Sequence, residues 1–147
     1  QEISPSQPLT VGIWEYNTQW QPVENTLNEL ILNRSDIISF HCYEPREKLT
    51  AVIESLKTFG RPLLCTEWLA RTAGSTVDLL EVFAEYGVGA INWGFVDGRT
   101  QTRFPWRSWT EPVTDEEPWF HELLHRDGSP YDVKEVDIFR YLTSLHT

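Results

Sequence analysis

The chain has 147 residues, which suits a single domain, and 40% of them are apolar. Its formal net charge of −10 argues against a nucleic-acid partner, because such binding depends on Lys and Arg contacts to phosphate, and against an anionic membrane surface. No apolar run reaches the roughly 18 residues that a membrane-spanning helix needs, so no membrane partner is expected.

The first part of the chain predicts two strand–helix units. Residues 9–14 form a short run of β-favouring residues, and apolar residues at helical spacing predict a helix over 23–33. A second strand is expected over 36–41. The helix after it should begin near Pro45 and end at Gly60, which would serve as a left-handed C-terminal cap.

Two further units are predicted downstream. A strand over 62–67 precedes a helix that Ser75 or Thr76 would cap and Gly87 would close. A fourth strand is expected over 89–93.

A long loop is predicted over 94–117, and a short helix over 119–124. The last helix should begin at Asp132. Glu135 follows three residues later, a spacing close to that of a capping box.

Four apolar strands alternating with amphipathic helices indicate an α/β fold with a parallel sheet, the (βα)₄ half of a TIM barrel. The domain is expected to span 1–147, with residues 1–7 as a polar tail. A lone four-stranded parallel sheet leaves two edges unpaired and its inner face uncovered. We therefore expect a homodimer in which two copies close one eight-stranded barrel.

The cysteines and histidines indicate no metal or cofactor. Cys42 and Cys65 lie in apolar, strand-like runs, where a buried free thiol is the expected state. His121 and His125 lack the spacing of a metal site. Two cysteines do not decide between a cytoplasmic and a secreted protein.

Polar and aromatic side chains gather at the carboxyl ends of all four predicted strands. Ligands bind at this edge in parallel α/β folds, so the pattern indicates a binding site there. The strand-end residues are Trp14, Glu15, Tyr16 and Asn17, then His41, Cys42, Tyr43 and Glu44, then Glu67 and Trp68, and finally Asn92, Trp93 and Gly94.

Three of these runs carry a family resemblance. Residues 37–43, 61–68 and 89–94 resemble strands six, seven and eight of the clan A, cellulase-like glycoside hydrolases, and residues 118–132 resemble the end of such barrels. The likeness covers nearly the whole chain. Its most specific part is the Thr66-Glu67-Trp68 run after a strand. The chain thus looks like the C-terminal half of such a barrel.

The resemblance implies roles for individual residues. Glu67 matches the catalytic nucleophile, His41 and Tyr43 match residues that orient the nucleophile and the sugar, and Trp93 matches a sugar platform. The family's acid/base glutamate follows an Asn at the end of strand four. No Asn-Glu pair lies at a strand end here, because Asn28-Glu29 falls within a predicted helix. On this resemblance the chain begins at strand five, and the acid/base is expected to be missing or supplied by another acid.

The other candidates come from the predicted mouth of the site. Glu15, Glu44 and Asp97 are candidate acid/base residues, each of which is also an ordinary solvated loop acid on the plainer interpretation. In a closed dimer, Asp97 of the partner subunit would be nearest the vacant acid/base position. The candidate substrate-binding residues are His41, Tyr43, Trp68, Asn92, Trp93, Trp14 and Gln101.

Two functions follow from this pattern. The first is an O-glycosyl hydrolase, cellulase- or xylanase-like, that acts on or binds a β-linked polysaccharide or oligosaccharide. The second is a non-catalytic half-barrel that binds carbohydrate or only associates with itself. The loop aromatics Phe104, Trp106 and Trp109 would line either a cleft or an interface, and Trp93 and Trp14 would be either sugar platforms or core.

Overall fold

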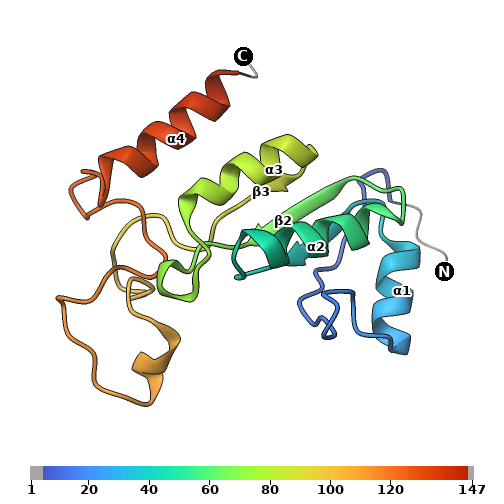
Figure 1. Cartoon of the computed structure of the whole chain (residues 1–147), viewed down its shortest axis with the longest axis horizontal. Helices are drawn as coiled ribbons and strands as arrows, with labels where there is room; N and C mark the ends of the chain where they lie inside the picture. The colour runs from blue at the N-terminus through green and yellow to red at the C-terminus, as the bar shows by residue number, and fades with distance from the viewer. Residues whose placement is uncertain (1–4, 146–147) are drawn as a thin grey trace.

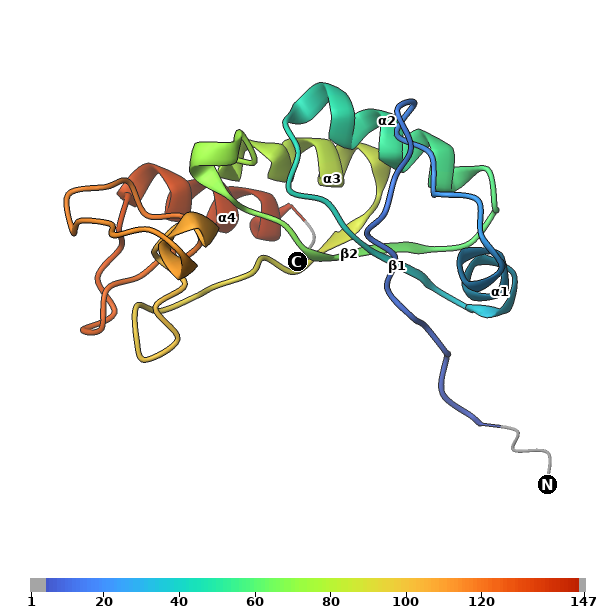
Figure 2. The same ribbon diagram turned by 90° about the horizontal axis from the view of Figure 1, so that it is seen from below.

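A computed structural model describes residues 5–145 of the chain. The fold is α/β, with an open three-stranded parallel sheet in the order β1-β2-β3. Strand β1 is Ile38–His41, β2 is Leu63–Glu67 and β3 is Gly89–Ala90. Helices α2 and α3 cover one face of this sheet, and the opposite face carries no helix in the described part of the chain (Figures 1 and 2).

The predicted parallel pairing is confirmed, but the predicted first strand over 9–14 is reduced to one bridge. Ile13 pairs in parallel with Phe40 and its N–H donates to the Ser39 carbonyl over 3.1 Å. Among residues 5–145 the segment has a neighbouring strand on one side, which places it at the edge of the sheet. Gly12 at its centre adds no packing side chain, which weakens a strand. Of the predicted tail, residues 5–7 are exposed and residues 1–4 lie outside the described residues.

The last strand is also shorter than predicted. Regular pairing of β3 ends at Ala90, although the backbone continues alongside β2, where the Ile91 N–H donates to Cys65 and the Trp93 N–H donates to Trp68. The backbone on the β2 side leaves extended geometry just after these contacts, at Leu69, which has a φ of 74°. The segment after β3 still brings Trp93 beside the end of β2.

Helices α1 and α2 form where the sequence predicts them. Helix α1 is Thr26–Arg34, and the Asn25 side chain caps it by accepting from the Asn28 N–H. Helix α2 is Arg46–Lys57, with Pro45 as its N-cap. Its periodic apolar side chains pack inward, with Leu49, Val52, Ile53 and Leu56 fully buried. Gly60 has the expected positive φ of 65°, but it lies beyond the helix, which ends with Thr58 as its C-cap.

Helix α3 is Leu80–Tyr86, preceded by a 3₁₀ turn over Val77–Leu79 and closed by a left-handed Gly87, as predicted. Neither predicted cap makes a capping hydrogen bond. Thr76 occupies the N-cap of the 3₁₀ turn without such a bond. The Ser75 hydroxyl instead accepts from the Leu69 N–H.

The predicted short helix over 119–124 is wrong. This segment is extended, because its backbone groups find partners in the long loop rather than in their own turn. The Phe120 N–H donates to the Arg103 carbonyl, and the Leu124 N–H donates to the Phe95 carbonyl. Leu124 also forms a parallel bridge with Val96. A 3₁₀ turn over Trp106–Trp109 is the only helical turn in the described loop before it.

Helix α4 is Val133–Ser144, and Asp132 caps it by accepting from the Lys134 N–H. The predicted capping box is not formed. Glu135 is turned toward Arg71, whose guanidinium binds both of its carboxylate oxygens at 2.8 and 2.6 Å.

The core lies between the sheet and helices α2 and α3. Phe40 and Cys65 are fully buried on its sheet side. Both cysteines, Cys42 and Cys65, are buried free thiols, as predicted. Within residues 5–145 the longest helices, α2 and α4, have 12 residues, and none has the length and apolar character needed to cross a membrane.

Candidate active site at the carboxyl edge of the sheet

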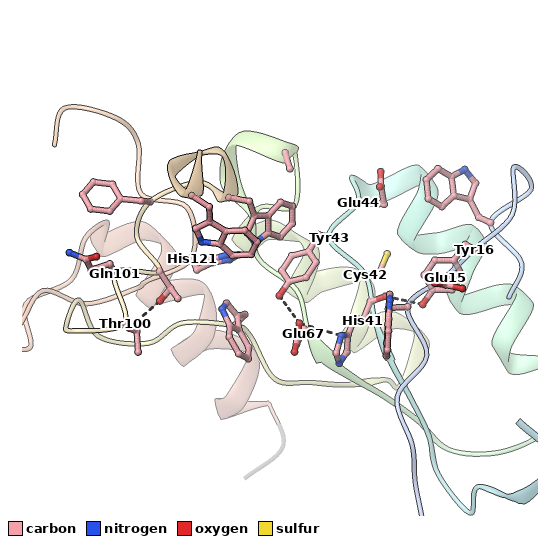
Figure 3. Close-up of a pocket in the computed structure, with 18 of the residues that line it drawn as sticks. Glu15, Tyr16, His41, Cys42, Tyr43, Glu44, Glu67, Thr100, Gln101 and His121 are labelled. Carbon is pink, nitrogen blue, oxygen red and sulfur yellow. Dashed lines mark hydrogen bonds and ion pairs between the residues drawn. The ribbon is translucent and has the colours of Figure 1, made fainter. Parts of the chain in front are cut away.

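A cleft of about 1130 Å³ opens at the carboxyl edge of the sheet. His41 and Glu67, the last residues of β1 and β2, lie in its middle, with the segment before α1 on one side and the loop after β3 on the other (Figure 3). It is lined by Trp14, Glu15, Tyr16, Trp20, Val23, His41, Cys42, Tyr43, Glu44, Glu67, Ala73, Trp93, Thr100, Gln101, Thr102, Phe104, Trp106, Trp109 and His121. The cleft therefore opens at the edge of the sheet where the sequence predicts a binding site.

Glu67, the last residue of β2, lies at the centre of this cleft. The Tyr43 hydroxyl donates to Glu67 Oε2 over 2.9 Å, and His41 Nδ1 lies 3.2 Å from the same oxygen (Figure 3). No hydrogen bond or ion pair to Glu67 Oε1 is found within the described part of the chain. Both the histidine and the glutamate are about a quarter exposed. One carboxylate oxygen is thus held, and the other has no protein partner among the described residues.

A register shift in the sheet brings these residues together. The pairing of β1 with β2 is regular up to Phe40 opposite Cys65, and then shifts so that His41 lies opposite Glu67. Without that irregularity, His41 would face Thr66. Bulges of this kind re-aim side chains next to active sites. The contact between His41 and Glu67 therefore depends on this local irregularity.

Further contacts fix His41 from behind. The Tyr16 hydroxyl donates to the His41 carbonyl over 2.8 Å, and the Trp14 ring stacks on the His41 ring with a centroid separation of 6.0 Å. Burial, together with the hydrogen bond to Glu67 and its charge, raises the pKa of Tyr43. Tyr43 consequently keeps its proton at neutral pH and remains a hydrogen-bond donor to the carboxylate.

His121 and its aromatic neighbours form the wall of the cleft next to Tyr43. The His121 ring lies 5.6 Å from Tyr43 and 5.8 Å from Trp106, and its Nδ1 is bonded to the Leu69 carbonyl. Burial lowers the pKa of His121, so its ring is neutral at pH 7. No sequence pattern indicates this position for His121, because residues 119–124 are predicted to be helical and His121 fits no metal motif.

Arg71 anchors the segment that carries His121. Besides its paired bonds to Glu135, the guanidinium donates to the carbonyls of Trp119 and Glu122, each over 3.0 Å. The segment is thereby tied to α4 behind the cleft. This ion pair joins residues 64 positions apart in the chain, which no sequence pattern predicts.

The three candidate acids have different surroundings. Glu15 and Glu44 line the cleft, but the Glu44 carboxylate is paired with Lys48 over 2.9 Å. Asp97 does not line the cleft. Its carboxylate is held by Arg103 and Arg126, both at 3.3 Å. Asp97 is therefore a structural acid of the loop within its own chain.

Five of the predicted substrate-binding residues line the cleft, namely His41, Tyr43, Trp93, Trp14 and Gln101. Trp68 does not. It is fully buried and packs edge-on against Phe83, because successive side chains point to opposite faces of the sheet and its neighbour Glu67 faces the cleft. Asn92 also lies outside the lining, and its side-chain amide donates to the Gly94 carbonyl.

The long loop contributes more to the cleft than the sequence could resolve. Phe104, Trp106 and Trp109, which suited a cleft or an interface equally well, line the cleft. Thr102 lines it too, and its hydroxyl donates to the carboxylate of buried Glu122 behind the wall. Burial raises the pKa of Glu122. Among residues 5–145 no group of three or more His, Cys, Asp or Glu side chains could hold a metal ion.

No protein-family model matches the chain, and no curated protein matches it either. A carboxylate with one tethered oxygen and one without a protein partner, set among exposed indole rings, can attack an electrophilic carbon or accept a hydrogen bond from a ligand that packs on the rings.

Proposed function

We propose that this chain is a glycoside hydrolase-like half-barrel that binds a β-linked oligosaccharide or polysaccharide in the cleft, with Glu67 as the nucleophile-equivalent. One observation carries the proposal. Tyr43 and His41 both engage Glu67 Oε2, while Oε1 has no partner within the described residues. This arrangement orients a carboxylate for attack from one oxygen, as retaining glycoside hydrolysis requires.

The reaction in this proposal has two steps. Glu67 Oε1 forms a bond to the anomeric carbon while the glycosidic C–O bond breaks, and an acid gives its proton to the departing sugar oxygen. Water then attacks the glycosyl ester, transfers a proton back to that residue and releases Glu67. Glu15 and Glu44 are the acids of this chain that line the cleft with Glu67. An acid from a partner subunit is the third source.

A non-catalytic function has a specific observation in its favour. Glu44 is neutralised by Lys48, Asp97 is held by two arginines, and Glu15 is exposed to solvent. General acid catalysis works best with a pKa near the working pH, which burial usually provides. On this second candidate function the cleft binds carbohydrate through its aromatic side chains, and Glu67 accepts a hydrogen bond from a sugar hydroxyl.

Hydrolysis assays distinguish the two functions. Aryl β-glycosides, β-glucan and xylan would be incubated with the wild-type chain and with Glu67→Gln, which keeps the shape and removes the nucleophile. The enzyme proposal predicts measurable turnover that the substitution lowers by at least 10²-fold. Turnover that survives in Glu67→Gln would refute the nucleophile role. Binding without turnover in either protein would support the non-catalytic function, and neither binding nor turnover would refute both.

We further propose that the open sheet is completed by a second copy of the chain. Beyond β3 on one side, and beyond residues 9–14 on the other, no strand pairs with the sheet within the described residues. Exposed Val11 and Ile91 lie in these edge segments. Open edges are templates for further pairing. Light scattering at micromolar concentration should give twice the 17.1 kDa of one chain, and a monomeric mass would refute this part of the proposal.

A further inference from the structure

We infer that His121 is a specificity-determining residue of the cleft, whose Nε2 accepts a hydrogen bond from one hydroxyl of the ligand. This role rests on the proposed function and adds a recognition contact on the side of Glu67 away from His41 (Figure 3). His121 is only 1% exposed in the single chain, so its position does not depend on a second copy completing the sheet.

The hydrogen bond of the His121 ring defines which nitrogen faces a ligand. Nδ1 is bonded to the Leu69 carbonyl, and a carbonyl oxygen only accepts, so Nδ1 carries a proton. In a neutral ring the other nitrogen, Nε2, then has a free lone pair. Nε2 has no hydrogen-bond partner within residues 5–145, yet it is not enclosed, and the residue lines the cleft. Nε2 can therefore accept a hydrogen bond from a ligand but cannot donate one.

The surroundings of His121 keep its ring neutral. Burial lowers the pKa of His121 most strongly, and the Arg71 guanidinium lowers it further. The Leu69 carbonyl and the Glu67 carboxylate raise the pKa, but they do not offset the effect of burial. Tyr43, which also faces the ring, keeps its proton. Nε2 consequently stays an acceptor at pH 7, and it becomes a donor only when the ring takes up a second proton below pH 6.5.

Two unusual backbone positions seat the ring. Leu69 has a φ of 74°, a conformation that L side chains rarely adopt, and in it the N–H donates to the Ser75 hydroxyl while the carbonyl binds His121. Gly94, with a φ of 85°, lies so close that a Cβ there would be 2.7 Å from the His121 Cβ. Unfavourable backbone conformations concentrate at functional sites, where the surrounding structure holds them. The convergence of both positions on one ring favours a role beyond filling the wall.

A neutral acceptor at this place selects the chemistry of the ligand. If the ligand lacks the matching donor, the acceptor is left unpaired, and the site rejects that ligand. A sugar offers several hydroxyl donors to Nε2. Fluorine in place of the hydroxyl that contacts Nε2 cannot donate, so such an analogue should bind about tenfold more weakly than its parent.

Nuclear magnetic resonance of the ¹⁵N-labelled imidazole rings tests the first step without a ligand. At pH 7 the wild-type chain should show His121 protonated on Nδ1 alone, with the signal assigned by its loss in His121→Asn. A ring protonated on Nε2, or on both nitrogens, would overturn the inference whatever the ligand is.

Isothermal titration tests the contact itself. The probes are the β-1,4-linked disaccharides of glucose, xylose and mannose, and then the monodeoxyfluoro analogues of the one that binds most tightly. One analogue should bind the wild-type chain about tenfold more weakly than its parent. His121→Asn keeps an amide N–H for the Leu69 carbonyl and removes Nε2, so it should weaken the parent about tenfold and bind that analogue as well as the parent. His125→Asn, at an exposed histidine outside the lining, should change neither affinity.

The pH dependence provides a readout that a merely structural role would not affect. The wild-type affinity for the parent disaccharide should fall over the pH range in which the His121 ring takes up its second proton, and this fall should be missing in His121→Asn. His41, Glu67, Glu15 and Glu44 also line the cleft, but they are the same in both proteins. An equal fall in both proteins, or equal losses for every fluorinated analogue, would overturn the role of His121 and leave the proposed function intact. If no disaccharide binds the wild-type chain, the proposed function fails and the ligand contact fails with it.

Discussion

Replacing Arg71 by Met should destabilise the protein strongly, because it removes the anchor behind the cleft. The side chain is 9% exposed and its partner Glu135 is 15% exposed. The substitution keeps an unbranched apolar stem of similar length but leaves the carboxylate unpaired and the Trp119 and Glu122 carbonyls without their donor. Removing one partner of a buried ion pair costs about 3–5 kcal/mol. Because water can reach Glu135 in part, we expect a loss of about 3 kcal/mol, at the lower end of that range.

Urea denaturation followed by circular dichroism measures this loss. For a chain of this size, a destabilisation of about 3 kcal/mol should also lower the melting temperature by about 6–12 °C. The double variant Arg71→Met/Glu135→Met removes the stranded charge as well, so it should recover part of the stability. A loss below about 1 kcal/mol in the single variant, or a double variant as unstable as the single one, would show that the ion pair does not anchor the segment.

Three other predictions concern residues around the core and the cleft. Burial raises the pKa of Glu122 above its ordinary 4.5. The stability that its protonated form contributes is therefore present below pH 4.5 and is lost as the pH rises through the pKa of the folded state. Glu122→Gln should flatten this decline in the free energy of unfolding measured by urea titration at several pH values, and an unchanged pH dependence would contradict the prediction. Gly94 has a φ of 85°, and Gly94→Ala would place a Cβ 3.0 Å from a backbone carbon. It should lower the free energy of unfolding clearly more than Gly60→Ala, where the φ is 65° and a Cβ meets nothing within 4 Å, so that only about 1–2 kcal/mol is lost. Equal melting temperatures for the two variants would refute the contact. A thiol reagent should label Cys42, whose pKa burial raises to about 12, and Cys65 only after unfolding, and rapid labelling of the native protein would rule out their burial.

The parts of the fold that the sequence predicted well are those decided by neighbours along the chain. Helix α2, Arg46–Lys57, follows from apolar residues at helical spacing after Pro45. The edge that carries the cleft was also predicted, because strands that alternate with helices run parallel and bring their carboxyl ends together. Glu67 and Trp93 lie in the cleft as expected.

The errors share a different cause. Residues 119–124 look locally helical, yet their backbone groups bond to the distant loop residues Phe95 and Arg103. Glu135 has the spacing of a capping residue, but Arg71, 64 positions away, binds it instead. In both cases a tertiary partner outweighs a local preference of about 1 kcal/mol, which is all that capping or propensity supplies.

The sequence by itself determined the α/β class, the parallel sheet and the edge at which the polar and aromatic residues collect, because each depends on periodicity within short segments. Only the tertiary structure decided which of those residues share the cleft. The register shift that turns His41 toward Glu67, the burial of Trp68 and the place of His121 all depend on contacts between segments far apart in the chain. Side-chain alternation sends neighbouring residues to opposite faces of a strand, so a single residue of register decides between core and cleft.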